Sequence, residues 1–146
     1  MRKIDKIILH CAATPEGKDF TVKDIRNWHL QRGFSDIGYH FVIYRDGTVH
    51  RGRAVEFAGA HTLGQNKNSI GICYIGGCAA DGKPKDTRTP EQRFALFKLV
   101  YELMQQYNIP ISKVFGHREF ANKACPSFDM NIFRKELQTF INNRKQ

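Results

Sequence analysis

The 146-residue chain has the length of one domain, and we expect residues 1–146 to share a single hydrophobic core. Its 41% hydrophobic and 25% charged residues are ordinary for a globular protein, and no apolar run approaches the roughly 18–20 residues that span a bilayer. Lys and Arg outnumber Asp and Glu by 23 to 14, and the net charge of +9 favours an acidic polymer as partner. Because nucleic-acid-binding motifs are absent from the sequence, we expect no nucleic-acid partner and no membrane insertion.

The N-terminus resembles a secretion signal only superficially. Its apolar run, Ile7–Leu9, has three residues and follows Asp5, so we expect a first strand there. The chain as written therefore predicts synthesis in the cytoplasm without a signal peptide. We also expect a monomer, because the sequence contains no coiled-coil pattern.

The cysteines do not have the spacing of a small disulfide-linked scaffold, and none forms a CxxC pair. Cys11 and Cys73 lie in apolar runs, where a thiol usually packs as a small buried hydrophobic group. Cys125 differs, because it stands beside a proline in a polar segment.

The first half of the chain predicts a strand, a helix and a hairpin. We expect a strand over Lys6–His10 and a helix that Thr21 caps, that continues to about Gln31 and that Gly33 ends, with Trp28 packed in the core. The following hairpin is predicted from two runs, Tyr39–Arg45 and Thr48–Arg51, which flank the turn dipeptide Asp46-Gly47.

The second half predicts two strands and two longer helices. Ser69–Ile75 is a continuous apolar run, typical of a central strand covered on both faces, and a polar loop follows over 76–88. Thr89-Pro90-Glu91-Gln92 is a capping box with proline at the first helical position. The apolar period of that helix predicts a buried face of Phe97, Val100, Met104 and Tyr107.

A short strand over Lys113–Gly116 and a last helix capped by Asp129 complete the prediction. The last helix is expected to turn four apolar side chains inward: Phe133, Leu137, Phe140 and Ile141. The order of elements predicts one α/β domain, with a mixed central sheet of about five strands and flanking helices.

Two histidines and one cysteine suggest a metal site. His10 ends the first predicted strand, His117 follows the last one, and Cys125 comes eight positions later. Two imidazoles and one thiolate are the three protein ligands expected of a catalytic zinc ion. By spacing alone, structural roles for these residues remain an alternative, because the first ligand is more than a hundred residues from the others.

Seven segments, taken in order from about residue 4 to 140, resemble the N-acetylmuramoyl-L-alanine amidase family. This family includes the short bacteriophage amidases often called phage lysozymes and the animal peptidoglycan recognition proteins. The similar segments are His10-Cys11-Ala12-Ala13-Thr14, Gly38-Tyr39-His40-Phe41, Arg45-Asp46-Gly47-Thr48-Val49, His61, Asn68-Ser69-Ile70-Gly71-Ile72, His117, and Lys123-Ala124-Cys125-Pro126-Ser127-Phe128-Asp129. Each segment alone is weak evidence for the family, whereas seven segments in the same order are specific to it.

The resemblance implies that His10, His117 and Cys125 bind one zinc ion, and that Tyr39 and Lys123 assist catalysis. The implied reaction is hydrolysis of the amide bond between N-acetylmuramic acid and L-alanine in cell-wall peptidoglycan. Zinc would polarise the scissile carbonyl, while the lysine would stabilise the oxyanion and the tyrosine would donate a hydrogen bond or relay a proton. The protein is expected to act on the cell wall, after it is released from the cytoplasm in the way of phage or prophage proteins.

Substrate contacts are predicted less directly. The resemblance places His61 in the substrate groove, and Asn66 and Asn68 are expected to contact the stem peptide because they lie near it in the sequence. His40 is expected to be packed on the face opposite Tyr39, since neighbouring strand residues alternate.

Other polar residues receive structural interpretations. His29 and His50 are expected at the surface. Asp129 is interpreted as a helix cap and not as a fourth metal ligand.

Alternative functions remain within the resemblance. Enzymes of one branch, which recycle anhydro-muropeptides, carry Glu in the strand over 70–75 and Asp as third ligand, where this chain has Cys73 and Cys125. Non-catalytic peptidoglycan-binding relatives typically lack the third ligand, so Cys125 favours an enzyme. Some phage members inhibit RNA polymerase through an N-terminal extension, and with nine residues before His10 we expect no such activity.

Overall fold

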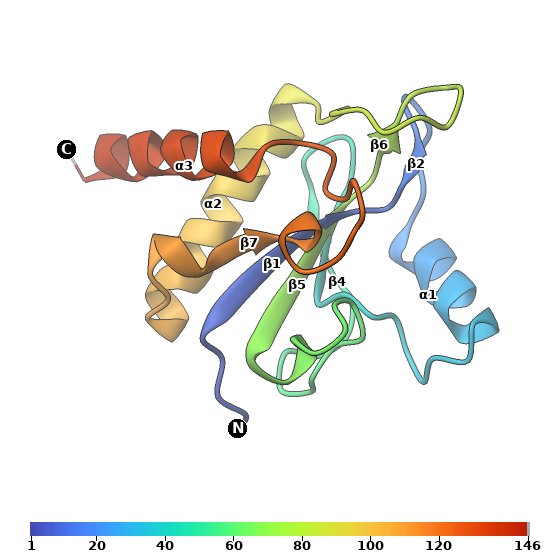
Figure 1. Ribbon diagram of the computed structural model, residues 1–146, viewed down its shortest axis with the longest axis horizontal. Coiled ribbons are helices and arrows are strands. Elements are labelled where there is room, and N and C mark those ends of the chain that lie inside the picture. Colours follow the sequence, from blue (N-terminus) through green and yellow to red (C-terminus); the bar gives the residue numbers. More distant parts are fainter. Residues whose placement is uncertain (146) are drawn as a thin grey trace.

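Within residues 1–145, which the computed structural model describes, five strands form the central sheet and three α-helices pack on it (Figure 1). The strands follow the spatial order β4-β3-β5-β1-β7, with bounds Val49–Arg51, Phe41–Ile43, Ser69–Tyr74, Lys6–Cys11 and Val114–Gly116. β1 pairs in parallel with β5 and β7, β3 pairs in parallel with β5, and β4 is antiparallel to β3. The predicted α/β fold with a mixed sheet is therefore confirmed.

The central strand β5 is buried along its whole length, as its apolar run predicts. Its side chains alternate, so Ile70, Ile72 and Tyr74 join the main core. Helices α2 (Pro90–Tyr107) and α3 (Met130–Arg144) supply the other side of that core.

Helix α1 (Val22–Gln31) lies across the sheet from α2 and α3 (Figure 1). It contributes Ile25 to a smaller cluster with Ile37, Val42 and Ile75. Two further short strands, β2 (Thr14–Pro15) and β6 (Gly77–Cys78), pair in parallel beside the main sheet.

The hairpin forms at Asp46-Gly47 as predicted, but its strands are shorter than the predicted runs. The amide of Tyr44 donates to the carbonyl of Thr48, and the amide of Gly47 donates back to Tyr44 at 2.9 Å. Gly47 has φ +85°, which glycine adopts without the steric cost of a Cβ. The turn therefore takes residues 44–48 out of the ladder, and Tyr39 precedes β3.

The three predicted helix caps are present. Thr21 and Thr89 each form a capping box, with Asp24 and Gln92 respectively, and Asp129 Oδ1 accepts the amide of Ile132 at 2.9 Å. These bonds satisfy amides at the helix starts that have no partner within the helix. All of them act within four residues, which is why the sequence predicts them.

The predicted buried face of α2 is partly wrong. Leu96, Leu99 and Leu103 face the sheet with Val100, whereas Phe97, Met104 and Tyr107 are only partly buried. The phenyl ring of Phe97 packs instead against rings of α3, with centroids 5.2 Å from Phe133 and 5.6 Å from Phe140. The aromatic side chains thus fill the contact between the two helices, which the helical period alone does not reveal.

The prediction of a core position for Trp28 is also wrong. Its side chain is 37% exposed and packs edge-on against Phe20, with ring centroids 5.3 Å apart. Ile25 is the buried residue of α1 in the smaller cluster, and Val22 packs against that cluster from the start of the helix.

Replacing Thr89 by alanine should lower the free energy of unfolding by about 1–2 kcal/mol. The hydroxyl accepts the amide of Gln92 at 3.0 Å and donates to the carbonyl of Arg45 at 2.7 Å, so both bonds are lost together. Urea unfolding measures the change, and Thr89→Ser, which keeps the hydroxyl, is the matched control. Equal stability of the alanine and serine variants would contradict this role.

Candidate active site

Two histidines lie at the carboxyl ends of neighbouring parallel strands. His10 is the penultimate residue of β1, and His117 directly follows β7 at the start of a short 3-10 helix, η3 (His117–Glu119). Leu9 of β1 is opposite Gly116 of β7, so the two side chains leave the same edge of the sheet. Their ring centroids are 4.6 Å apart.

Cys125 reaches these histidines from the loop between η3 and α3. Hydrogen bonds hold this loop against the sheet: the Tyr74 hydroxyl donates to the carbonyl of Pro126 at 2.7 Å, and the Ser127 hydroxyl donates to the carbonyl of Gly77 at 2.9 Å. The Cys125 Sγ then lies 3.8 Å from His10 Nδ1 and accepts the amide of Cys11 at 3.2 Å.

The three side chains have the geometry of a metal site. One ligand atom from each of His10, His117 and Cys125 lies within 4.8 Å of the others. Zinc binds nitrogen at about 2.0–2.1 Å and sulfur at about 2.3 Å, so one ion fits between ligand atoms at this separation. Two imidazoles and one thiol also form the donor set of a catalytic zinc, with room for a fourth ligand. Asp129 caps α3 instead, in agreement with its interpretation from the sequence.

Burial keeps both histidines in the form that binds metal. Desolvation, followed by the neighbouring charges of His61 and His117, holds the pKa of His10 well below its ordinary value. Desolvation also lowers the pKa of His117, with the cation of Lys123 as the second cause. Neutral imidazoles can ligate a cation without first losing a proton.

A cavity of about 530 Å³ opens beside the metal-binding group. Tyr39, His61, His117 and Lys123 all contribute to its lining. The ring of Tyr39 lies 5.1 Å from that of His10, centroid to centroid, and the side chain of Lys123 is exposed. The structure thus brings both residues expected to assist catalysis to the same cavity.

Tyr39 is a hydrogen-bond donor in this environment. Burial is the main cause that raises the pKa of its phenol well above the ordinary value, and the neighbouring Cys73 and Cys125 raise it further. The hydroxyl therefore keeps its proton at neutral pH and can donate to an oxygen that gains negative charge.

The expectation that His29 is a surface residue is wrong. Its side chain is 7% exposed, and its Nδ1 accepts the amide of Gly38 at 2.8 Å, one residue before Tyr39. It lines the same cavity as Tyr39, together with Arg32 and Phe34 at the end of α1. Sequence reasoning missed His29 and Arg32 as residues of this cavity, because α1 and the candidate metal ligands come together only in the folded chain.

The residues predicted to contact substrate occupy different positions. His61 lies beside the cavity but is 9% exposed, with its Nδ1 2.9 Å from His10 Nε2. Asn66 is in the cavity lining, and its Oδ1 accepts the amides of His61 and Thr62 at 2.9 Å. Asn68 ends the 3-10 helix η1 (Asn66–Asn68). Among residues 1–145, it is not one of those that line this cavity.

Two further histidines, His40 and His50, make contacts within the fold and do not line this cavity. His40 is fully buried and packed, as expected, with its Nδ1 accepting the amide of Gly71 at 3.0 Å. Its ring centroid lies 5.8 Å from that of His61, and it lines a different cavity from Tyr39. His50 is partly exposed and stacks on Tyr44 at 3.6 Å.

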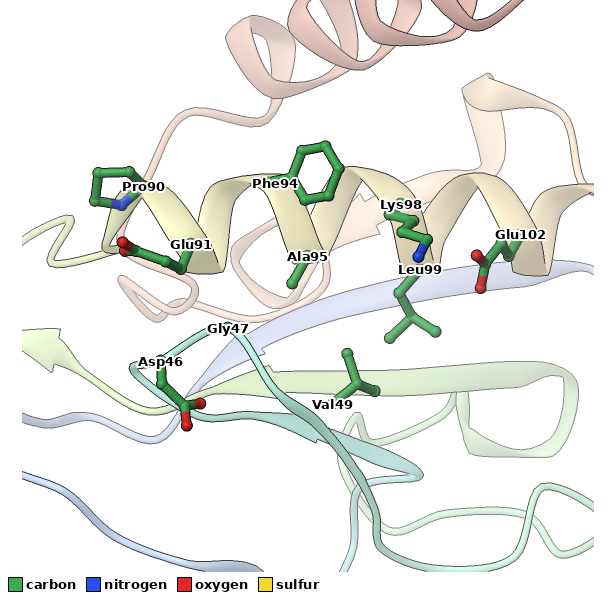
Figure 2. A pocket seen from close by; sticks show the side chains of 10 residues that line it. All are labelled: Asp46, Gly47, Val49, Pro90, Glu91, Phe94, Ala95, Lys98, Leu99 and Glu102. Atoms are coloured by element: carbon green, nitrogen blue, oxygen red, sulfur yellow. The ribbon is translucent and has the colours of Figure 1, made fainter.

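A larger cavity, of about 720 Å³, lies between α2 and the turn of the β3–β4 hairpin (Figure 2). Val49, Ala95 and Leu99 form its apolar surface, and acidic side chains such as Glu91 and Glu102 border it. Its lining among the described residues contains no histidine, cysteine or tyrosine, so the smaller cavity is the candidate active site.

Comparison with known proteins decides the family. A family model described as N-acetylmuramoyl-L-alanine amidase matches residues 1–128. The chain belongs to the N-acetylmuramoyl-L-alanine amidase family. It is 44% identical over 140 residues to an endolysin of Escherichia phage T7, covering 96% of this chain and 91% of the relative. It is 39% identical over 143 residues to an endolysin of Enterobacteria phage K11, covering 98% and 93%.

Solved structures agree with this membership. The N-acetylmuramoyl-L-alanine amidase LysC from Clostridium intestinale superposes with a TM-score of 0.81 and 31% identity, over 94% of this chain and 87% of that one. Drosophila PGRP-LB gives a TM-score of 0.72 and 28% identity, over 86% of this chain and 76% of that one. The predicted resemblance is thereby confirmed, and the chain is an amidase.

Among residues 1–145, every helix is too short or too polar to cross a membrane.

The buried histidines should make the metal-free protein sensitive to acid. Burial, then the neighbouring His40 and His117, lowers the pKa of His61 to about 3, whereas an unfolded histidine titrates near 6.5. Between these values the unfolded chain binds a proton at residue 61 that the folded chain does not, so stability falls as pH drops below about 6.5.

In chelator-treated protein, His61→Asn should therefore flatten the loss of stability between pH 6 and pH 4. The reduction should approach about 1.4 kcal/mol per pH unit, the value for one proton. Urea unfolding of both proteins at several pH values measures the slopes. Identical slopes would show that residue 61 does not titrate differently on unfolding.

Proposed function

We propose that the protein is a zinc-dependent N-acetylmuramoyl-L-alanine amidase that cleaves the amide bond between N-acetylmuramic acid and L-alanine in peptidoglycan. One observation carries the proposal: the ligand atoms of His10, His117 and Cys125 converge to within 4.8 Å beside a cavity lined by Tyr39 and Lys123. The family supports the reaction, and the endolysin relatives support the cell wall as the place where the protein acts.

The side chains around the cavity divide the work of amide hydrolysis. A zinc ion held by the three ligands would supply a Lewis acid for the scissile carbonyl. The protonated hydroxyl of Tyr39 donates a hydrogen bond to the oxygen on which negative charge develops, and the ammonium group of Lys123 stabilises the same charge. The tyrosine can also pass a proton to the leaving amine.

The rest of the cavity suits a short acidic glycopeptide. Arg32 provides a cation in the lining, and Phe34 and Leu63 provide apolar surface, with the Leu63 side chain 96% exposed. The net charge of +9 favours approach to an acidic wall polymer. We propose that the muramyl group and the first residues of the stem peptide occupy this cavity.

The presence of Cys125, Tyr39 and Lys123 at one cavity supports an enzyme over a protein that only binds peptidoglycan. A pure binding module would need the cavity but not a third metal ligand, whereas here several hydrogen bonds hold the Cys125 loop in place. Tyr39 and Lys123 add a donor and a cation at the same cavity.

Digestion of purified sacculi tests the reaction and the metal together. The protein should release free L-alanine amines without new reducing sugar ends, and a chelator should abolish the release until zinc is restored. Cys125→Ala should bind zinc at least about 100-fold more weakly, because one of three ligands is lost, and should be inactive. New reducing ends would identify a glycosidase, and parental activity of Cys125→Ala would refute the metal assignment.

Lys123→Ala should separate catalysis from metal binding. Removing a cation that stabilises the oxyanion should lower kcat by about 100-fold or more while the zinc content stays at one per chain. Lys123→Arg should keep part of the activity because it keeps the charge, and Lys135→Ala, on the exposed side of α3, is the control. Loss of zinc from Lys123→Ala would instead show that the lysine is structural.

A further inference from the structure

We propose that His61 is a positioning residue, which orients the imidazole of His10 for metal binding through a hydrogen-bonded chain, His10–His61–Ser69. The inference rests on the proposed zinc site. It assigns to His61 a role that does not require contact with substrate, although the residue lies beside the cavity.

The chain begins at the ring nitrogen of His10 that does not face Cys125. Its Nδ1 lies 3.8 Å from Cys125 Sγ, whereas its Nε2 lies 2.9 Å from His61 Nδ1. The other nitrogen of His61, Nε2, lies 3.3 Å from Ser69 Oγ. Thr62 Oγ1 supports the junction, at 2.9 Å from His61 Nδ1 and 3.3 Å from His10 Nε2.

Together with a metal ion on His10 Nδ1, these contacts fix which ring nitrogens carry hydrogen. A neutral imidazole has one N–H, and a metal ligand needs a free lone pair. If His10 binds metal through Nδ1, its hydrogen is on Nε2 and is donated to His61 Nδ1. His61 must then carry its own hydrogen on Nε2, where Ser69 Oγ accepts it. With a metal ion on His10 Nδ1, this is therefore the arrangement of hydrogens that satisfies both contacts of the chain, His10 with His61 and His61 with Ser69.

The fold makes room for this ring and holds it. A Cβ at Gly71 would lie 2.6 Å from His61 Cδ2, and a Cβ at Gly59 would lie 2.7 Å from the same atom. The imidazole thus occupies a slot that only glycine at both positions leaves open. The backbone is held as well, because Asn66 Oδ1 accepts the amides of His61 and Thr62 at 2.9 Å.

The burial of the chain distinguishes positioning from substrate contact. Ser69 is fully buried, Thr62 is 2% exposed and His61 is 9% exposed. Both ring nitrogens of His61 already have protein partners, so neither is free for a ligand in the cavity. Partners of this kind on the second nitrogen of a histidine ligand fix its orientation, and their loss typically weakens metal binding 10–100-fold.

Zinc affinity is the first test, measured by competition with a chromophoric chelator. His61→Leu should raise the zinc Kd by about 10–100-fold. His61→Asn should restore most of the affinity, because its side-chain oxygen can replace Nδ1 as acceptor for His10. His50→Leu, which removes a histidine outside the chain, should bind zinc like the parent. Circular dichroism verifies that each variant is folded.

Two results of this experiment would overturn the proposal. One is parental zinc affinity in His61→Leu together with a raised KM for wall fragments, which would make His61 a substrate contact. The other is equal weakening in the leucine and asparagine variants, which would show that the bond to His10 is not what matters. If His61→Leu does not fold, Ser69→Ala must weaken zinc binding severalfold for the proposal to stand.

Nitrogen NMR of the metal-free parent provides a second test that needs neither zinc nor activity. A scalar coupling across the hydrogen bond should join His10 Nε2 to His61 Nδ1, whichever ring carries the hydrogen, and its absence would overturn the proposed chain. The two proposals can fail separately. A parent that does not bind zinc refutes the metal proposal, and the NMR assignment then decides whether the chain orients His10.

Discussion

The candidate active site depends on the parallel pairing of β1 with β7. Parallel strands end at the same edge of a sheet, so this one pairing brings residues 107 positions apart in sequence, His10 and His117, to a ring separation of 4.6 Å. The pairing of β1 with β5 on its other side buries β1 from both flanks and makes it rigid. A metal site needs such rigidity, because its ligands must be held close together before the ion arrives.

The third ligand comes from a loop, and the core supplies the rigidity that the loop lacks. Tyr74 is fully buried on β5, yet its hydroxyl reaches the carbonyl of Pro126, next to Cys125. Arg88 reinforces the same loop, because its guanidinium stacks 3.7 Å over the ring of Phe128 and pairs with Asp86. The loop that carries Cys125 is thus fixed by groups that themselves belong to the packed interior.

The site combines exposed cations at the cavity with buried, uncharged histidines behind it. The cavity carries exposed cations, Arg32 and Lys123, which suit an acidic substrate, while the histidines behind it are buried and neutral. A protonated His10 would meet both desolvation and the repulsion of Lys123. Neutral rings allow hydrogen bonds between two imidazoles, and the contact of His10 with His61 is of this kind.

The features that the sequence predicted well are those set by local chemistry. The caps at Thr21, Thr89 and Asp129 and the turn at Asp46-Gly47 involve atoms within about four residues. The central position of β5 also followed from its unbroken apolar run. The buried face of α2 was misjudged because two different surfaces, the sheet and α3, compete for its apolar side chains.

The family was readable from the sequence because its segments occur in order along the chain, and the same segments contain the candidate metal ligands. The tertiary structure alone decided what surrounds those ligands. Only folding places His29 against the amide of Gly38, and the ring of His61 between Gly59 and Gly71. The sequence by itself therefore determined which residues can hold a metal, whereas three-dimensional packing decided which nitrogen of His10 lies near Cys125 and which near His61, because that depends on contacts between distant segments.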